Sequence, residues 1–146
     1  KCCVGLHGLA KNKIEGDKKT PIGIYSLGNL FYRKDRLGII NTKLKKKIIS
    51  KYMGWCDDIK SSKYNKLIRI SKKKVKHEKL YRNDKKYDLL IPIKYNMIKP
   101  IRNKGSAIFI HLTENYKPTA GCIALKKNDF LILLKLINKK TKIKII

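Results

Sequence analysis

The chain has 146 residues, of which 42% are hydrophobic and 8% aromatic, and its 37 Lys and Arg against 10 Asp and Glu give a formal net charge of +27. This length and apolar content predict one folded domain over residues 1–146 rather than a disordered tail, and no apolar run approaches the roughly 18 residues that cross a bilayer. Of the basic residues, 32 are Lys, and they are spread along the chain with small clusters at 45–47, 72–74 and 139–140. Specific recognition of nucleic-acid bases favours Arg over Lys. We therefore expect non-specific attraction to polyanions and no specific nucleic-acid partner.

Short runs of β-type residues bounded by Gly, Pro, Asn and Asp recur along the chain and predict strands at 2–6, 23–27, 66–70, 87–95, 105–111, 121–125 and 142–146. The first strand follows directly on Lys1, which predicts that an upstream segment, with any signal peptide, has been removed. The polar stretch 11–21 contains Gly and Pro and predicts a hairpin connection between the first two strands. Segment 43–52 is ambiguous, and a short helix is one interpretation of it.

One helix is clearly indicated near the C-terminus. Asn128 or Asp129 is suited to cap it, and the apolar residues between Phe130 and Ile137 form a broad face, with lysines closing the last turn. Many short strands with so little helix predict a mainly β fold. We expect a mostly antiparallel β-sandwich or partial barrel that carries this long helix and has room for a second, short one.

The cysteines and histidines do not form a metal-binding pattern. The four Cys, at 2, 3, 56 and 122, include no CxxC pair, and the His at 7, 77 and 111 share no ligand spacing with them. We therefore expect no metal site and no cofactor. A disulfide between Cys56 and either Cys2 or Cys3 is left open, since sequence alone does not decide it.

The chemically informative stretch is GSAIFIHLTENYKPTAGCIALKKNDF, residues 105–130. A thiol attacks a carbonyl as the thiolate, so a nucleophilic Cys needs a partner that takes its proton. His111 ends a predicted strand, and one Pro-containing loop returns the chain to Cys122 eleven residues later. Gly121 permits a tight turn that aims the amides of Gly121 and Cys122 at a developing oxyanion. A lone His and a lone Cys in a β protein are more often core residues, so this pattern by itself leaves catalysis open.

Four segments in order resemble the catalytic domain of the L,D-transpeptidases (YkuD type), and the likeness covers nearly the whole chain. EGDKKTPIGIYSL (15–27) resembles the family's G-D-x-x-T-P-x-G-x-F/Y segment. GWCDD (54–58) with YNKLIRI (64–70), and then YDLLIPIKYN (87–96), resemble the middle of one branch of the family. IFIH followed by PTAGCIAL resembles its signature, a His and then Ser/Thr-x-Gly-Cys-aliphatic.

The resemblance implies a cysteine acyltransferase of the cell envelope, without a cofactor, that acts on peptidoglycan stem peptides. Cys122 is then the nucleophile and His111 its base, Gly121 and Cys122 donate oxyanion amides, and the backbone carbonyl of Thr119 orients the imidazole. The thioester passes to an amine and makes a crosslink. Hydrolysis by the same dyad, or a weakly active basic domain that binds anionic polymer, are the alternatives that the sequence leaves open.

Two departures from the commoner signature S-H-G-C-h-R concern specificity. Ala120 replaces its second His and Ala124 its Arg, and the loop from His to Cys is shorter than in most members. The missing Arg removes an expected anchor for substrate carboxylates.

Five residues in the middle of the chain are candidates to line the cleft and bind substrate, although adjacent carboxylates also serve as turn or salt-bridge residues: Trp55, Asp57, Asp58, Tyr64 and Asn65.

Overall fold

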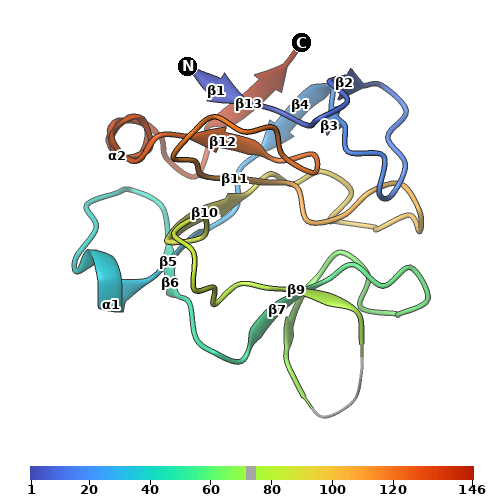
Figure 1. Cartoon of the computed structure of the whole chain (residues 1–146), viewed down its shortest axis with the longest axis horizontal. Coiled ribbons are helices and arrows are strands. Elements are labelled where there is room, and N and C mark those ends of the chain that lie inside the picture. The colour runs from blue at the N-terminus through green and yellow to red at the C-terminus, as the bar shows by residue number, and fades with distance from the viewer. Residues whose placement is uncertain (72–74) are drawn as a thin grey trace.

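The computed structural model describes residues 1–71 and 75–146, so the lysine cluster at 72–74 lies outside the described residues (Figure 1). It is mainly β, with 31% strand and 10% helix. In chain order the elements are β1 (Cys2–Cys3), β2 (Leu9–Ala10), β3 (Thr20–Pro21), β4 (Gly23–Ser26), β5 (Leu30–Tyr32), α1 (Lys34–Leu37), β6 (Lys46–Ile48), β7 (Met53–Cys56), β8 (Leu67–Arg69), β9 (His77–Lys79), β10 (Leu89–Pro92), β11 (Phe109–Leu112), β12 (Ile123–Leu125), α2 (Lys127–Leu136) and β13 (Lys142–Ile145).

A six-stranded sheet in the order β1-β12-β11-β10-β5-β6 forms the centre of the fold. Three of its five pairs are antiparallel. The β5–β6 pair at one edge and the β11–β12 pair run parallel, and in the latter His111 lies opposite Ala124. Strands β4 and β13 form a second sheet, β2 and β3 a third, and β8-β7-β9 a fourth. In Figure 1 the helix α2 and the β4–β13 ribbon lie on one side of the central sheet, and the β7–β9 sheet lies on the other.

The two faces of the central sheet support two separate clusters, as the period-2 alternation of strands requires. On one face Leu89, Ile91 and Ile110 pack against Phe130 and Leu134 of α2, all of them nearly inaccessible to solvent. The opposite face carries alternate residues of the same strands, among them Phe31, Leu90 and Phe109, packed against Trp55, Leu80 and Tyr87. This second face also carries Cys122 and His111.

The helix α1 fixes the loop that follows β9. Arg33, just before α1, donates to the carbonyl of Arg82 at 2.9 Å, and Arg36 within it donates to the carbonyls of Asn83 and Asp84 at 3.1 and 3.0 Å. Arg36 also forms an ion pair with the buried Asp88 at 2.8 Å. These bonds hold residues 82–88 as one wall beside the second face of the sheet.

The structure confirms a mainly β fold with a long helix near the C-terminus and a second, short one. Other expectations were wrong in detail. The stretch 11–21 does not join a hairpin, because β1 pairs with β12, β4 pairs with β13, and β2 pairs with β3 in parallel. Segment 43–52 is not helical: it supplies β6, an exposed edge strand, while the short helix α1 precedes it. Helix α2 begins at Lys127, before the expected caps.

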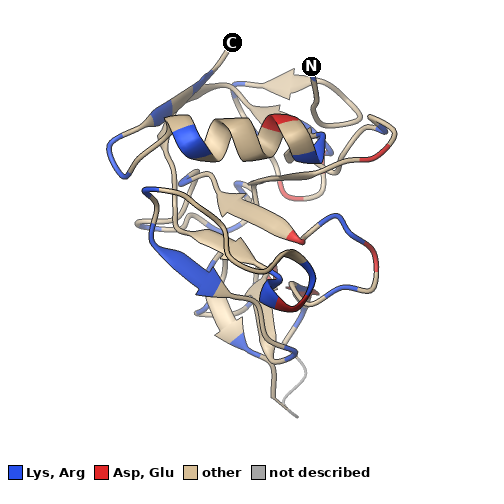
Figure 2. Ribbon diagram, turned by 90° about the vertical axis from the view of Figure 1, so that its left-hand side faces the viewer, with Lys and Arg blue, Asp and Glu red and all other residues tan. Residues whose placement is uncertain are grey.

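Charge and cysteines complete the description of the chain. Lys and Arg are scattered over loops, α2 and the edge strand β6, with few acidic residues in the same view (Figure 2). All four cysteines are free thiols, so Cys56 forms no disulfide with Cys2 or Cys3 in this structure. Among the described residues, no helix has the length and apolar character needed to span a membrane.

Candidate active site

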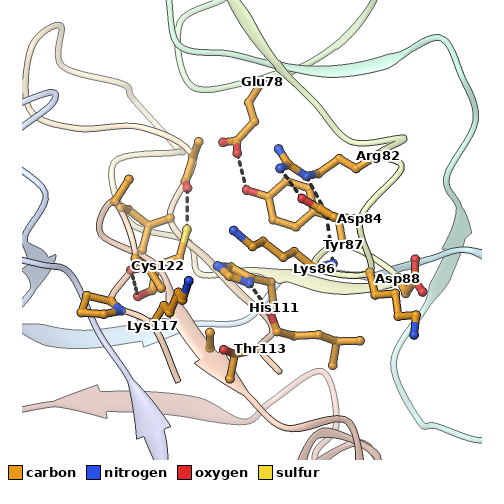
Figure 3. Close-up of a pocket in the computed structure, with 18 of the residues that line it drawn as sticks. Glu78, Arg82, Asp84, Lys86, Tyr87, Asp88, His111, Thr113, Lys117 and Cys122 are labelled. Carbon is orange, nitrogen blue, oxygen red and sulfur yellow. Dashed lines mark hydrogen bonds and ion pairs between the residues drawn. The ribbon is translucent and has the colours of Figure 1, made fainter. Parts of the chain in front are cut away.

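Cys122 and His111 lie on neighbouring strands at the floor of one cleft of about 1220 Å³ (Figure 3). Cys122 immediately precedes β12, and His111 lies within β11, the parallel neighbour of β12. Because His111 is opposite Ala124 and side chains alternate along a strand, Cys122 and His111 share one face of the sheet. A short loop thus brings the two groups together only because β11 and β12 pair in parallel.

The thiol of Cys122 is buried and protonated at rest. Its Sγ lies 3.2 Å from the carbonyl oxygen of Ala107, to which the S–H donates, and it accepts the N–H of Phe109 at 3.3 Å. Burial raises the pKa of Cys122 to about 12, and the nearby carboxylate of Glu78 acts in the same direction. At rest Cys122 is therefore a neutral thiol, and it would need a base to take its proton before it could act as a nucleophile.

His111 has the geometry of that base. Its Nδ1 lies 2.9 Å from the carbonyl oxygen of Leu112, and because a carbonyl only accepts, Nδ1 carries the proton and Nε2 is left free to take one. Burial lowers the pKa of His111 below its ordinary value of 6.5, with Lys86 and Arg82 adding to the effect. The ring packs edge-on against Tyr87, with centroids 5.3 Å apart. The imidazole is thus neutral, oriented and held in place.

The turn before Cys122 is fixed through the side chain of Thr119. Its hydroxyl donates to the carbonyl of Cys122 at 2.6 Å and accepts the N–H of Gly121 at 3.1 Å. The carbonyl of Thr119 accepts the N–H of Leu6 at 2.9 Å, so it is Leu112, and not Thr119 as expected, that orients the imidazole. Gly121 has φ +134° and a Cβ there would lie 2.8 Å from the carbonyl oxygen of Lys19, which explains the glycine.

This arrangement also changes the expected oxyanion site. The N–H of Gly121 is already donated to Thr119, whereas the N–H of Cys122 has no acceptor within residues 1–71 and 75–146. Of the two backbone amides that the sequence predicts as oxyanion donors, that of Gly121 is therefore hydrogen-bonded within the turn, and that of Cys122 is not.

Comparison with known proteins gives one match. The family described as the L,D-transpeptidase catalytic domain, YkuD, matches residues 1–145. The chain belongs to the YkuD family. No curated protein and no solved structure gave a match. Enzymes of this family are L,D-transpeptidases that act on peptidoglycan, and their work lies in the cell envelope.

Two of the residues expected to line the cleft are buried and do not line it. Trp55 is 3% exposed, packs edge-on against Phe109 with centroids 5.1 Å apart, and donates its Nε1–H to Oδ1 of Asn65 at 2.9 Å. Asn65 is 1% exposed, and the same Oδ1 accepts the N–H of Ala107 at 3.0 Å. Asn65 therefore positions Ala107, whose carbonyl accepts a hydrogen bond from the thiol of Cys122.

The other three expected residues are divided between cleft and surface loops. Asp57 lines the cleft, and burial raises the pKa of its carboxyl. Asp58 closes a turn by accepting the N–H of Lys60 at 3.0 Å and does not line the cleft. Tyr64 is buried away from the cleft and donates its hydroxyl to Glu15. Of the five, only Asp57 faces the space that a substrate would enter.

Sequence reasoning missed three residues that contact this site. Tyr87, 5% exposed, packs against His111 and donates its hydroxyl to Glu78 (Figure 3). Ala107 has φ +52°, and its carbonyl accepts the hydrogen bond from the thiol of Cys122. Lys13 is buried and paired with Asp17. Only the last left a signal, a Lys and an Asp four residues apart in one polar turn.

Proposed function

We propose that this chain is a cysteine acyltransferase that carries out L,D-transpeptidation on peptidoglycan stem peptides. The observation that supports it best is the neutral pair at the cleft floor: a protonated thiol of Cys122 beside an imidazole of His111 whose Nε2 is free, in a YkuD domain. The substrate is a stem tetrapeptide, attacked at the carbonyl of the L-centre of its diamino acid.

The first half-reaction follows from the two resting hydrogen bonds. When substrate enters, the thiol turns from the carbonyl of Ala107, and Nε2 of His111 takes its proton. Sulfur bonds to the carbonyl carbon, and the electrons move to oxygen beside the N–H of Cys122. The oxyanion then collapses, the bond to the terminal D-Ala nitrogen breaks, and the imidazolium returns the proton to that nitrogen.

The second half-reaction transfers the acyl group. An amine of a neighbouring stem, or of an anchored protein, enters the cleft, loses a proton to Nε2 of His111 and attacks the thioester carbon. The carbon–sulfur bond breaks, and the imidazolium returns that proton to the Cys122 sulfur, which restores the resting thiol. Water in place of the amine gives L,D-carboxypeptidase-type hydrolysis by the same steps. The cell envelope is the proposed place of action, because peptidoglycan is there.

The missing Arg of the signature is compensated by charge from another part of the chain. Ala124 lines the cleft without any exposed side-chain surface and offers no charge. Lys86 and Lys117 line the same cleft, and Figure 3 shows both directed toward its interior, next to His111. We infer that these lysines attract the substrate carboxylates that the family's Arg would bind.

Incubation with a disaccharide tetrapeptide tests the proposal. Mass spectrometry is expected to find free D-Ala together with a dimer that has lost one D-Ala, and a tripeptide if water competes with the amine. Cys122→Ala, which keeps the fold's small buried side chain, is the matched control and should form none of these products. Absence of free D-Ala with the folded wild-type protein would contradict the proposal, and tripeptide without dimer would favour the hydrolytic alternative.

A further inference from the structure

Lys13 is a lysine buried on the turn side of the nucleophile. It is 3% exposed, and its Nζ lies 2.6 Å from Oδ1 of Asp17. Its stem runs against Gly105, where a Cβ would lie only 2.7 Å from the Lys13 Cε atom. Lysines are rarely buried to this extent unless a particular contact holds them, so its position calls for an explanation.

The partner of Lys13 is itself rigidly held. Asp17 Oδ2 accepts the N–H of Ile14 at 2.9 Å, and Oδ1 accepts the N–H of Lys19 at 2.9 Å. Burial raises the pKa of Asp17, but the bonds to Lys13 and to the two amides outweigh it, so the pKa lies below 3.8 and the carboxylate is charged. A fixed carboxylate fixes the ammonium, and it uses one of that ammonium's three N–H bonds.

The ammonium of Lys13 lies close to Gly121. A Cβ placed on Gly121 would lie 3.3 Å from Nζ of Lys13, so the charge lies beside the residue that precedes the Cys122 amide. Lys13 and Cys122 line the same cleft. Only one backbone N–H, that of Cys122, is left as a donor at that position, because the N–H of Gly121 is donated to the hydroxyl of Thr119.

We infer that Lys13 is a catalytic residue whose ammonium is the second donor to the oxyanion, beside the N–H of Cys122. The inference rests on the proposed acyl transfer at Cys122. As the sulfur–carbon bond forms, the carbonyl π electrons move to oxygen, and that negative charge is met by a cation already held in place by Asp17. When the oxyanion collapses, the carbon–oxygen double bond returns and the leaving group departs, so Lys13 keeps its proton throughout.

Two neutral reagents separate this role from a structural one. Acylation of Cys122 by p-nitrophenyl acetate develops an oxyanion, whereas its alkylation by iodoacetamide does not. Lys13→Met removes the charge and keeps the length. It should lower the acylation rate by about 10²-fold, as loss of one oxyanion donor does, and leave the alkylation rate within threefold. Lys135→Met, on the exposed face of α2, is the matched control and should change neither rate.

The ratio of the two rates decides the inference. Equal loss of both rates would mean that Lys13 acts on the thiol or on the fold, and an unchanged acylation rate would mean that it only anchors the turn; either result overturns the inference. If Lys13→Met leaves Asp17 unpaired and unfolds, Lys13→Met/Asp17→Asn removes both charges and is measured in the same way. Because neither reagent is a stem peptide, a failure to release D-Ala would refute the proposed function without affecting this ratio.

Discussion

Replacing the base is the perturbation whose size follows most directly from the structure. With the pKa of Cys122 raised to about 12 by burial, almost none of this thiol is ionised at pH 7. Wild-type acylation by a carbapenem avoids this penalty by passing the proton to His111. His111→Ala should therefore lower the rate at pH 7 by roughly 10²–10⁴-fold, the usual contribution of a positioned base.

The pH profile separates a base from a structural residue. Because the pKa of His111 lies below 6.5, the wild-type rate should rise through that pKa and then stay level. The His111→Ala rate should instead climb about tenfold per pH unit above 7, since hydroxide must now ionise a thiol of high pKa. Added imidazole should partly restore the variant. Stopped-flow measurements give both pH profiles, and circular dichroism checks that the variant is folded. Parallel profiles, or a variant rate within threefold of wild type at pH 7, would mean that His111 is a structural residue and not the base.

Three further predictions concern the residues that hold the dyad in place. Thr119→Ser keeps the hydroxyl that bonds Cys122 and Gly121, so its acylation rate should stay within threefold of wild type, whereas Thr119→Val should cost about 1–3 kcal/mol of unfolding free energy in urea titrations. Gly121→Ala should lower the acylation rate at least ten times more than Ala120→Ser does, and it should also lower the free energy of unfolding more. Of the two residues, only Gly121 has a positive φ and lies against a carbonyl oxygen. Asn65→Leu leaves the buried N–H groups of Trp55 and Ala107 unpaired. It should therefore destabilise the protein by about 2–5 kcal/mol and slow acylation in the fraction that remains folded. An unchanged acylation rate in that fraction would show that Asn65 has no positioning role.

The sequence was sufficient for the parts of the fold that have a local signal. The apolar face of 130–137 predicts α2, and the runs of β-type residues around Phe109 and Ile123 predict β11 and β12. It could not give the parallel pairing of β11 and β12, because a loop of about ten residues without a helix ordinarily joins antiparallel strands. Two-residue strands such as β2 have no periodicity to read.

The roles of individual site residues depend on contacts between distant segments. Asn65 resembles a polar cleft residue in sequence, yet its left-handed backbone and its bonds to Trp55 and Ala107 make it a buried support. Thr119 was expected to act through its carbonyl, but that oxygen is occupied by the N–H of Leu6, which lies 113 residues earlier. The role of such a residue depends on which residues contact it in the folded protein, and a single sequence does not give these contacts.

The proposed role of Cys122 as the nucleophile of an acyl transfer is tested by the mass of the intact protein after incubation with a carbapenem. A YkuD thiolate is expected to open the β-lactam ring and retain the product. We predict one adduct per chain, mapped by peptide mass spectrometry to Cys122, and none on Cys2, Cys3 or Cys56, which do not line the cleft. An adduct on one of those three thiols with Cys122 unmodified, or no adduct on the folded protein, would contradict the account.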